Sequence, residues 1–469
     1  MNAYLGFSRT RKVSASRLNN QRGEPRPRSI LDIHSRKGIS TAAGVAIVVV
    51  LLVIAAGAYY YVAYYAPSSS TTQSTTATTT GPLPGKGYSI GVVFDVGGLG
   101  DRGFNDLAYQ GMIQANKTLG VDYKYEVATS VNGIPNLFNQ LISDHLSLIV
   151  GVGFDDDSAI SQYAAQYPTQ KFAQVDGDIY NVTNVVAIKY QEHVGSAVVG
   201  ALSAAMAGNG GKIGFLGGVT VGIIYKFWNG FKFGVTWADQ YLAKVDGTTY
   251  NNTLTEVYDS TGFNGFADPS GGYSNGQAMI AKGDKIIFTA AGGTGIGTFN
   301  AIGKYDQQQG WNWSNSTAPP VWAIGVDANQ DYYGTQQFFT AAQQNKTASN
   351  LTPPSFILTS EIKKVDFGVF KVMSWVVAGN YSSLWNNPAT FAPSFFNGAT
   401  QLCGANGDAP CHVRGVYLLG LAQGAVGATG FQYTSQFLTP IAKQVMSQIT
   451  KGILNGSITV PEVYTDTGV

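Results

Sequence analysis

The chain has 469 residues, with 29 lysine and arginine residues, 28 aspartate and glutamate residues, and a formal net charge of +1. These charges are distributed unevenly, because residues 1–38 hold nine basic and two acidic side chains, whereas residues 88–469 hold 19 basic and 26 acidic ones. Proteins that bind nucleic acid usually present a basic face, so the acidic balance of residues 88–469 argues against nucleic acid as a partner.

No charged residue occurs between Lys37 and Lys86, and this stretch begins with an almost wholly apolar run at residues 39–66. About 20 apolar residues are enough to cross the hydrocarbon core of a membrane as one helix. Because basic residues precede the run, the positive-inside rule predicts a cytoplasmic amino terminus. We therefore expect residues 1–38 to be a basic cytoplasmic leader, residues 39–66 to be a single transmembrane helix in the cell membrane, and the remainder to be extracellular.

Residues 35–40 place a basic pair and Gly38 directly before the apolar run. This segment resembles the cleavage site of archaeal type IV prepilin-like signal peptides, which are cut after the glycine and are found on binding proteins as well as pilins. Ala43 stands where mature pilins commonly have a glutamate. An uncleaved signal anchor fits the same residues, so cleavage after Gly38 and filament assembly both stay open.

Residues 67–87 are rich in serine, threonine and glycine and lack apolar periodicity, which predicts an extended linker. Beyond the linker, apolar runs alternate with helix-like stretches such as residues 104–119 and 192–207. Such alternation predicts parallel sheets with crossover helices, and about 380 residues suit two medium-sized lobes. The expected buried strands are residues 88–94, 148–152, 172–175, 185–188, 212–216, 285–289, 321–326 and 356–359.

The two cysteines, Cys403 and Cys411, lie in a glycine-containing loop of the predicted exterior region. In an oxidising exterior such a pair is most simply a disulfide that closes a hairpin loop. A metal site with the adjacent His412 is the alternative, but no further cysteine or histidine nearby completes four ligands. Nine glycosylation sequons also fit an exterior, glycosylated protein, at Asn116, Asn181, Asn251, Asn312, Asn315, Asn345, Asn350, Asn380 and Asn455.

Several predicted strands end in polar or glycine-rich clusters, at the strand ends where open α/β sheets bind ligands. The first cluster reads Asp95-Val-Gly-Gly-Leu-Gly-Asp101-Arg-Gly-Phe104-Asn105. Its glycines allow a ligand to approach the backbone, and Asp101 or a neighbour can cap the helix expected to begin near Phe104. Taken alone, Asp95 fits a turn or cap residue as well as a ligand-binding residue.

Together with Gly111, this cluster is similar to the amino-terminal signature of the basic membrane protein family of purine nucleoside-binding lipoproteins. Gly103 departs from the family's usual serine, and the apolar helix replaces its lipid-modified cysteine. The likeness continues in the same order to about residue 460, through Asp176-Gly, Gly200-Ala-Leu, Lys212-Ile-Gly-Phe-Leu-Gly-Gly, Phe227-Trp228-Asn-Gly-Phe, Asp268-Pro, Ala290-Ala-Gly-Gly293-Thr-Gly, Ala323-Ile-Gly-Val-Asp327, and Thr359-Ser with Lys363.

The resemblance implies an α/β, type I periplasmic-binding-protein fold, in which two Rossmann-like lobes joined by three crossovers close on a ligand, here preceded by one transmembrane helix. On this basis, residues 88–190 and about 360–430 form the first ligand-binding lobe. Residues 191–359 and about 431–469 form the second.

The resemblance also implies ligand-binding residues at the matching positions. Phe104 would stack on one face of a purine, and either Phe227 or Trp228 on the other; in nucleic-acid analogues such stacking contributes about 1–3 kcal/mol per base. Buried aromatic residues more often belong to a core, which is the alternative for each ring. The full implied set is Asp95, Phe104, Asn105, Asp176, Phe227, Trp228, Gly293, Asp327 and Lys363.

The polar members of this set would recognise the rest of a nucleoside. Asp95, Asn105 and Asp176 would bind polar edges, whereas Asp327 and Lys363 would hold the ribose hydroxyls, since a carboxylate can accept hydrogen bonds from both hydroxyls of a diol. The alternatives are a turn for Asp176 and a solvated charge for Lys363.

Residues 293–297 resemble a dinucleotide-binding loop, but the glycine spacing differs, and we expect Gly293 to begin a helix that faces a neutral ligand. The histidines show no metal-binding spacing and no catalytic motif, so we expect no metal, no cofactor and no enzymatic activity.

The favoured hypothesis is an extracytoplasmic solute-binding receptor that captures a purine nucleoside by hinge closure and delivers it to the permease of an ABC importer. The ATPase would be a separate subunit, because the sequence contains no Gly-x-x-x-x-Gly-Lys loop. One alternative is a structural or adhesive surface or filament protein with a pilin-like anchor. The other is a nucleoside hydrolase that uses Asp95 and Asp327.

Overall fold

The computed structural model describes residues 82–314, 317–344, 346–382, 401–402, 410–411 and 414–465. The predicted leader, the cleavage site at Gly38 and the predicted transmembrane helix lie outside these residues, as does Cys403 of the predicted disulfide. Among the helices that are described, none is both long and apolar enough to cross a bilayer.

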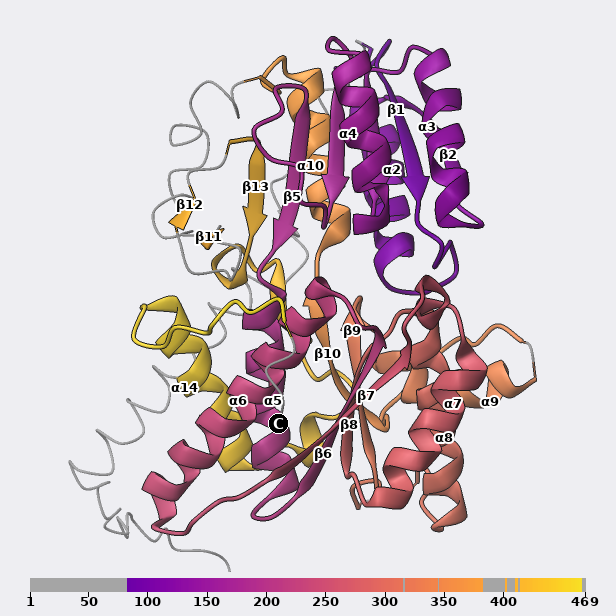
Figure 1. The fold of residues 1–469 in the computed structure, drawn as a ribbon. Coiled ribbons are helices and arrows are strands. Elements are labelled where there is room, and N and C mark those ends of the chain that lie inside the picture. The colour runs from indigo at the N-terminus through magenta and orange to yellow at the C-terminus, as the bar shows by residue number, and fades with distance from the viewer. Residues whose placement is uncertain are drawn as a thin grey trace, which may run out of the picture. The chain divides into compact units, whose positions relative to one another are not determined.

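The first sheet has six strands in the order β13-β5-β4-β3-β1-β2 (Figure 1). Its strands are β1 (Ser89–Phe94), β2 (Asp122–Val127), β3 (Leu148–Val152), β4 (Phe172–Val175), β5 (Val185–Tyr190) and β13 (Val416–Leu419). All neighbouring strands are parallel. Four helices accompany this sheet: α2 (Phe104–Leu119), α3 (Ile134–Ser143), α4 (Asp157–Gln166) and α10 (Val365–Val377). Helix α2 packs against α10, and α3 packs against α4. We call this unit lobe 1.

The second sheet has the order β14-β10-β9-β8-β6-β7, and only β14 runs antiparallel to its neighbour. Its strands are β6 (Lys212–Val219), β7 (Thr253–Ser260), β8 (Ile286–Ala290), β9 (Trp322–Asp327), β10 (Ile357–Lys363) and β14 (Val426–Ala428). Its helices are α5 (Glu192–Ala207), α6 (Gly222–Asp246), α7 (Pro269–Lys282), α8 (Gly293–Gln308), α9 (Gln336–Gln343) and α14 (Pro440–Leu454). We call this unit lobe 2.

The chain passes between the two sheets three times, after β5, after β10, and between β13 and β14. The two predicted α/β lobes and their three crossovers are therefore present. Each of the eight apolar runs expected to be a strand coincides with one, and the two expected helices match α2 and α5.

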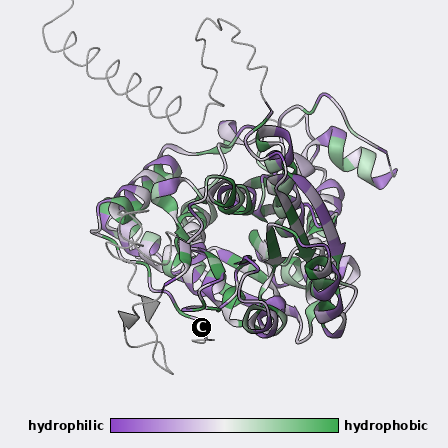
Figure 2. Ribbon diagram, turned by 90° about the horizontal axis from the view of Figure 1, so that it is seen from above, coloured by the Kyte–Doolittle hydropathy of each residue, from purple (hydrophilic) through white to green (hydrophobic). Residues whose placement is uncertain are grey.

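Burial explains why the sequence signal for these strands is strong. Every residue of β3, β4, β5 and β8 is buried, as expected for parallel strands covered by helices on both faces. In the view from above, many strand residues are hydrophobic, whereas many hydrophilic residues lie on the outer parts of the helices (Figure 2). Local sequence also determines where helices begin. At the start of α7, the side chain of Asp268 accepts a hydrogen bond from the backbone of Gly271, and Pro269 is the first helical residue.

Candidate functional site

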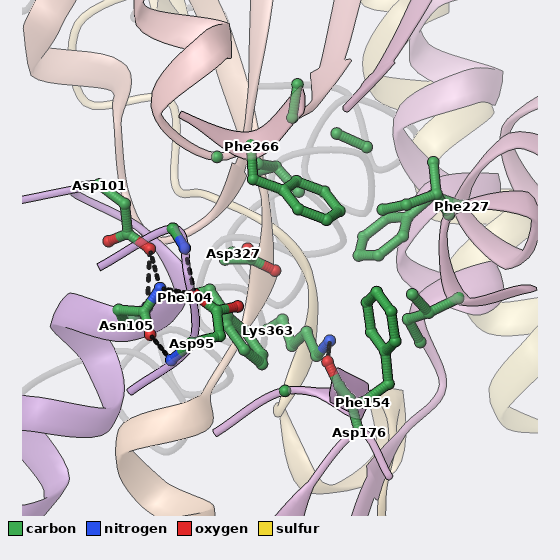
Figure 3. A pocket seen from close by; sticks show the side chains of 18 residues that line it. Asp95, Asp101, Phe104, Asn105, Phe154, Asp176, Phe227, Phe266, Asp327 and Lys363 are labelled. Carbon is green, nitrogen blue, oxygen red and sulfur yellow. Dashed lines mark hydrogen bonds and ion pairs between the residues drawn. The ribbon is translucent and has the colours of Figure 1, made fainter. Parts of the chain in front are cut away.

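A pocket lies where the carboxyl ends of strands from both lobes meet, with an empty volume of about 560 Å³ that includes space open to solvent. Figure 3 shows its side chains. Such strand ends are where open α/β sheets bind ligands. Seven of the nine residues expected to bind ligand line this single pocket: Asp95, Phe104, Asn105, Asp176, Phe227, Asp327 and Lys363.

The other two expected residues do not line the pocket. Trp228 is completely buried, and its ring centre lies 5.3 Å from that of Phe215 on β6, so it packs α6 onto the sheet of lobe 2. Of the two aromatic residues considered from the sequence, Phe227 lines the pocket and Trp228 does not. Gly293 is the first residue of α8, but the pocket wall is formed by the preceding residue, Gly292.

Four phenylalanine rings surround the pocket (Figure 3). Phe104 begins α2 of lobe 1, and Phe227 lies in the second turn of α6 of lobe 2. Sequence reasoning missed the other two, Phe154 and Phe266. Phe154 could have been found from its position, because it follows β3 and Gly153 at a strand end, where the other ligand-binding candidates also lie.

Hydrogen bonds fix the Asp95 carboxylate. The Asn105 side-chain nitrogen donates to Asp95 Oδ1 at 2.7 Å and to Asp101 Oδ2 at 3.0 Å, while Asn105 Oδ1 accepts from the Asp95 backbone at 3.2 Å. Asp101 also accepts from the backbone of Asn105 at 2.8 Å and so satisfies a donor in the first turn of α2, although Gly103 occupies the N-cap position. Asn105 therefore orients Asp95, and its own donors are already occupied by protein carboxylates.

A buried ammonium group, that of Lys363, also lines the pocket. Lys363, at the end of β10, is 1% exposed and forms an ion pair with Asp176 of lobe 1. Its Nζ is also 3.2 Å from Glu192 Oε1, and lies 5.0 Å from the ring centre of Phe104 and 5.6 Å from that of Phe227. Lys363 thus joins residues of both lobes beneath the aromatic rings.

Asp176 and Asp327 occupy matching places in the two lobes. Asp176 directly follows β4, Asp327 is the last residue of β9, and both have left-handed backbones, with φ of 66° and 62°. For residues other than glycine this conformation costs about 1–3 kcal/mol and is concentrated at functional sites. Within the described structure, Oδ1 of each carboxylate is buried and lacks a hydrogen-bond partner. Two residues that line the pocket therefore carry acceptor oxygens that no donor in the described part of the chain uses.

Burial shifts the titration of these groups. It raises the pKa of Asp95 to about 8, with the nearby Asp155 adding to the shift. Burial also raises the pKa of Asp327 to about 7, although Lys363 opposes that change. Burial alone would lower the pKa of Lys363, but Asp176, Glu192 and Asp327 outweigh it and raise the pKa, so Lys363 stays cationic.

Contacts beside the pocket join the two lobes. The Arg102 guanidinium, from the loop before α2, lies 5.0 Å from the ring centre of Tyr333 and 5.2 Å from that of Phe338. Gln330 Nε2 of lobe 2 donates to the backbone oxygen of Arg102 at 3.2 Å. Phe154 of lobe 1 stacks on Phe263 of lobe 2 with ring centres 5.5 Å apart. The lobes are therefore in contact around the pocket.

Two α/β lobes with a pocket at their facing strand ends, rich in aromatic rings and carboxylates, define the class of solute-binding proteins with a periplasmic-binding-protein-like fold. No cluster of three or more histidine, cysteine, aspartate or glutamate residues suited to a metal ion occurs in the part of the chain that is described. The family model described as ABC transporter substrate-binding protein PnrA-like matches residues 89–352. The chain belongs to this family, which confirms the membership expected from its motifs.

Relatives support this assignment. An uncharacterized lipoprotein of Pyrococcus furiosus is 30% identical over 301 residues, which cover 63% of this chain and 66% of that protein, just under two thirds of its length. The ABC transporter nucleoside-binding protein BmpA of Lactococcus lactis subsp. cremoris is 29% identical over 278 residues, covering 58% of this chain and 70% of that protein.

A solved structure supports the fold. The crystal structure of an ABC transporter solute-binding protein from Aeropyrum pernix K1 superposes with a TM-score of 0.57 at 24% sequence identity. The match covers 80% of this chain and 94% of that one. At this identity the likeness concerns the fold alone.

Proposed function

We propose that the protein captures a purine nucleoside in this pocket and delivers it to an ABC importer. The observation that carries the proposal is the joint presence of aromatic rings from both lobes and buried, unpartnered carboxylate oxygens in one pocket. Flat rings favour a flat heterocycle, and free acceptor oxygens favour a ligand rich in hydroxyl and amino donors. A nucleoside has both parts.

The charges of the pocket favour a ligand without phosphate. Lys363 is its buried cation, and its ammonium already contacts Asp176 and Glu192. Lys363 is the only lysine or arginine among the described residues that line the pocket, so a phosphate would find no further cation, and any ionised carboxylate there would repel it in a site of low polarity. A nucleotide is therefore a poor ligand, whereas a neutral nucleoside loses nothing by this arrangement.

Each pocket residue then has a physical role. Phe104 and Phe227 stack on the two faces of the base, and Asp95, held by Asn105, binds the polar edge of the base. Asp327 accepts hydrogen bonds from ribose hydroxyls. Lys363 completes the sugar site, and Asp176 holds its ammonium in place. Gly293 and Trp228 have no direct role in this arrangement, because neither lines the pocket.

Binding is coupled to closure of the lobes in this proposal. Ligand contacts come from both lobes, so the ligand stabilises the closed arrangement over an open one. Arg102, Phe154 and Phe263 add direct contacts between the lobes in that closed arrangement. Family membership favours capture over hydrolysis, since the family consists of solute-binding proteins and not of enzymes.

The location proposed for the protein is the outer face of the cell membrane. The apolar run at residues 39–66 would serve as a single-pass anchor, and the linker at residues 67–87 would let the binding lobes reach a permease with its separate ATPase subunit. The Pyrococcus furiosus relative is named a lipoprotein. That name supports attachment to a membrane, although a lipoprotein is held there by a lipid and not by a helix. The sequons and the pair Cys403 and Cys411 fit the same exterior location.

A thermal-shift screen of the full chain tests the proposal. Inosine, guanosine and adenosine are each compared with their monophosphates, free bases, sugars and amino acids. We expect the nucleosides to raise the melting temperature, because a ligand that binds the folded state stabilises it by RT ln(1 + [L]/Kd). Stabilisation by a sugar or an amino acid alone, or by the monophosphates as strongly as by the nucleosides, would refute the proposal.

A further inference from the structure

We propose that Glu462, in the segment that follows α14, is a positioning residue that fixes Lys363 in the pocket through Lys226 and Glu192. Glu462 does not line the pocket and was not among the residues that the sequence singled out. The inference rests on the proposed function, because its main measurement is nucleoside affinity.

The carboxy-terminal segment is attached to α6 by specific contacts. The side-chain nitrogen of Asn229 on α6 donates to the backbone oxygen of Thr465 at 3.0 Å and of Val463 at 3.4 Å. The Tyr464 hydroxyl donates to Glu462 Oε1 at 2.8 Å. This segment thus lies beside the first turns of α6, the same turns that bring Phe227 to the pocket.

A row of alternating charges leads from this segment to the pocket. Lys226 Nζ is 2.9 Å from Glu462 Oε1 and 2.6 Å from Glu192 Oε2. The other oxygen of Glu192 is 3.2 Å from Lys363 Nζ, and Lys363 in turn pairs with Asp176. Lys226 and Glu192 are both completely buried, so neither charge can exchange its partner for water. A change at one end must therefore alter the pairing along the row.

The row also crosses the hinge between the lobes. Glu192 is the first residue of α5, directly after the first crossover, and Lys363 ends β10, directly before the second. The Tyr190 hydroxyl donates to the Lys364 backbone oxygen at 3.0 Å, which joins these two places. Lys226 Nζ donates to the Tyr190 backbone oxygen at 3.0 Å, which links the row to the first crossover. Glu462 therefore acts on the two connections about which the lobes would move.

Neutralising Glu462 should redistribute these pairs. Lys226 would keep Glu192 as its single carboxylate partner and would attract it more strongly. Glu192 would then hold Lys363 less firmly, leaving that ammonium to Asp176 and Asp327. The sugar side of the pocket would lose its defined geometry, although no residue that touches the ligand has been changed.

The test compares Glu462→Gln with the wild type in the full chain, using calorimetric titration with guanosine between pH 5.5 and 8.5. We expect affinity to fall by roughly three- to tenfold, a size typical of coupling within one charge network. We also expect the pH midpoint of binding to move to lower pH, because Glu192 then leaves more of the Lys363 ammonium to Asp327, and a closer cation lowers the pKa of a carboxyl group. The charged groups acting on Asp327 are Lys363, Asp176, Asp101, Glu192 and Glu361.

Asp144→Asn is the matched control, because it removes a carboxylate from an exposed pair, 2.8 Å from Lys124, on lobe 1. It should change neither affinity nor the pH midpoint. If Glu462→Gln lowers only the melting temperature and leaves both binding measures at wild-type values, the positioning role is refuted. Should Glu462→Gln fail to fold, Tyr464→Phe, which removes one hydrogen bond to Glu462, takes its place with the same expected directions.

A measurement without ligand separates this inference from the proposed function. If the wild type binds no nucleoside, the proposed function fails, and hydrogen exchange of the hinge segments 190–194 and 361–365 then decides the inference. We expect faster exchange there in Glu462→Gln than in Asp144→Asn. Equal exchange in the two variants would refute the link between Glu462 and the hinge.

Discussion

Replacing Asp327 with asparagine should weaken nucleoside binding mainly by removing charge, since the two side chains are nearly the same size. Asp327 is 8% exposed, and its Oδ1 has no partner within the described structure. A hydrogen bond to a charged group contributes about 1.5–3 kcal/mol, part of which the asparagine oxygen can retain. We therefore expect a loss of about 1–3 kcal/mol above pH 7.5, which corresponds to about 5- to 150-fold in Kd.

The pH dependence of this loss identifies its cause. Because burial raises the pKa of Asp327 to about 7, a proton competes with the ligand below that pH. The contribution of Asp327 to affinity should be complete above this value and fall by up to about tenfold per pH unit below it. Asparagine does not titrate, so the ratio of the two affinities should narrow on acidification. Asp95 titrates in both proteins and cancels from this ratio.

Isothermal titration calorimetry with guanosine at pH 5.5, 6.5, 7.5 and 8.5 measures both quantities. Phe367→Ala provides a matched control, because this ring is exposed on α10 and lies outside the pocket. An Asp327→Asn protein with wild-type affinity at pH 8.5 would remove Asp327 from the binding site. A constant ratio at all four pH values would refute the assigned role of its charge.

Three further substitutions test other parts of the pocket. Phe104→Ala should weaken binding of inosine, guanosine and adenosine about equally, by about 1–3 kcal/mol, because stacking hardly distinguishes purines; calorimetry showing a loss for one base only would contradict this. Arg102→Ala should speed dissociation in stopped-flow experiments by about two- to fivefold, as a cation–π contact of about 0.5–1 kcal/mol is lost; an unchanged rate would exclude a role in closure. Lys363→Met should lower the free energy of unfolding in urea by about 3–5 kcal/mol, since it leaves Asp176 buried without its cation. If the free energy of unfolding falls by less than about 1 kcal/mol, Asp176 is protonated or solvated.

Sequence reasoning predicted the strands and the polar strand ends because both have local signals. Buried parallel strands read as continuous apolar runs, and Asp95, Asp176 and Asp327 follow such runs directly. The four edge strands of the two six-stranded sheets were missed. Strands β2 and β7 have no fully buried residue and carry polar side chains, whereas β13 and β14 are only four and three residues long. The resemblance to a known family supplied the roles of these residues, which the apolar pattern alone could not.

Side-chain direction was less predictable than position. Phe227 and Trp228 are neighbours on α6 and both are apolar, so composition could not decide which ring faces the pocket and which packs on β6. Phe154 and Phe266 come from short turns without periodicity. The ion pair between Lys226 and Glu462 joins residues far apart in the sequence, and only the folded chain brings them together.

The unusual backbone of Asp176 and Asp327 has a consequence for the entropy cost of capture. The left-handed main chain sets the direction of each Cα–Cβ bond, and burial of both side chains limits their rotamers, so the direction of each carboxylate should persist when the pocket is empty. A solute entering the pocket would then meet acceptors already in place, and little ordering entropy would be lost on contact. The strain is borne once, when the protein folds, and is not repeated at each cycle of loading and release.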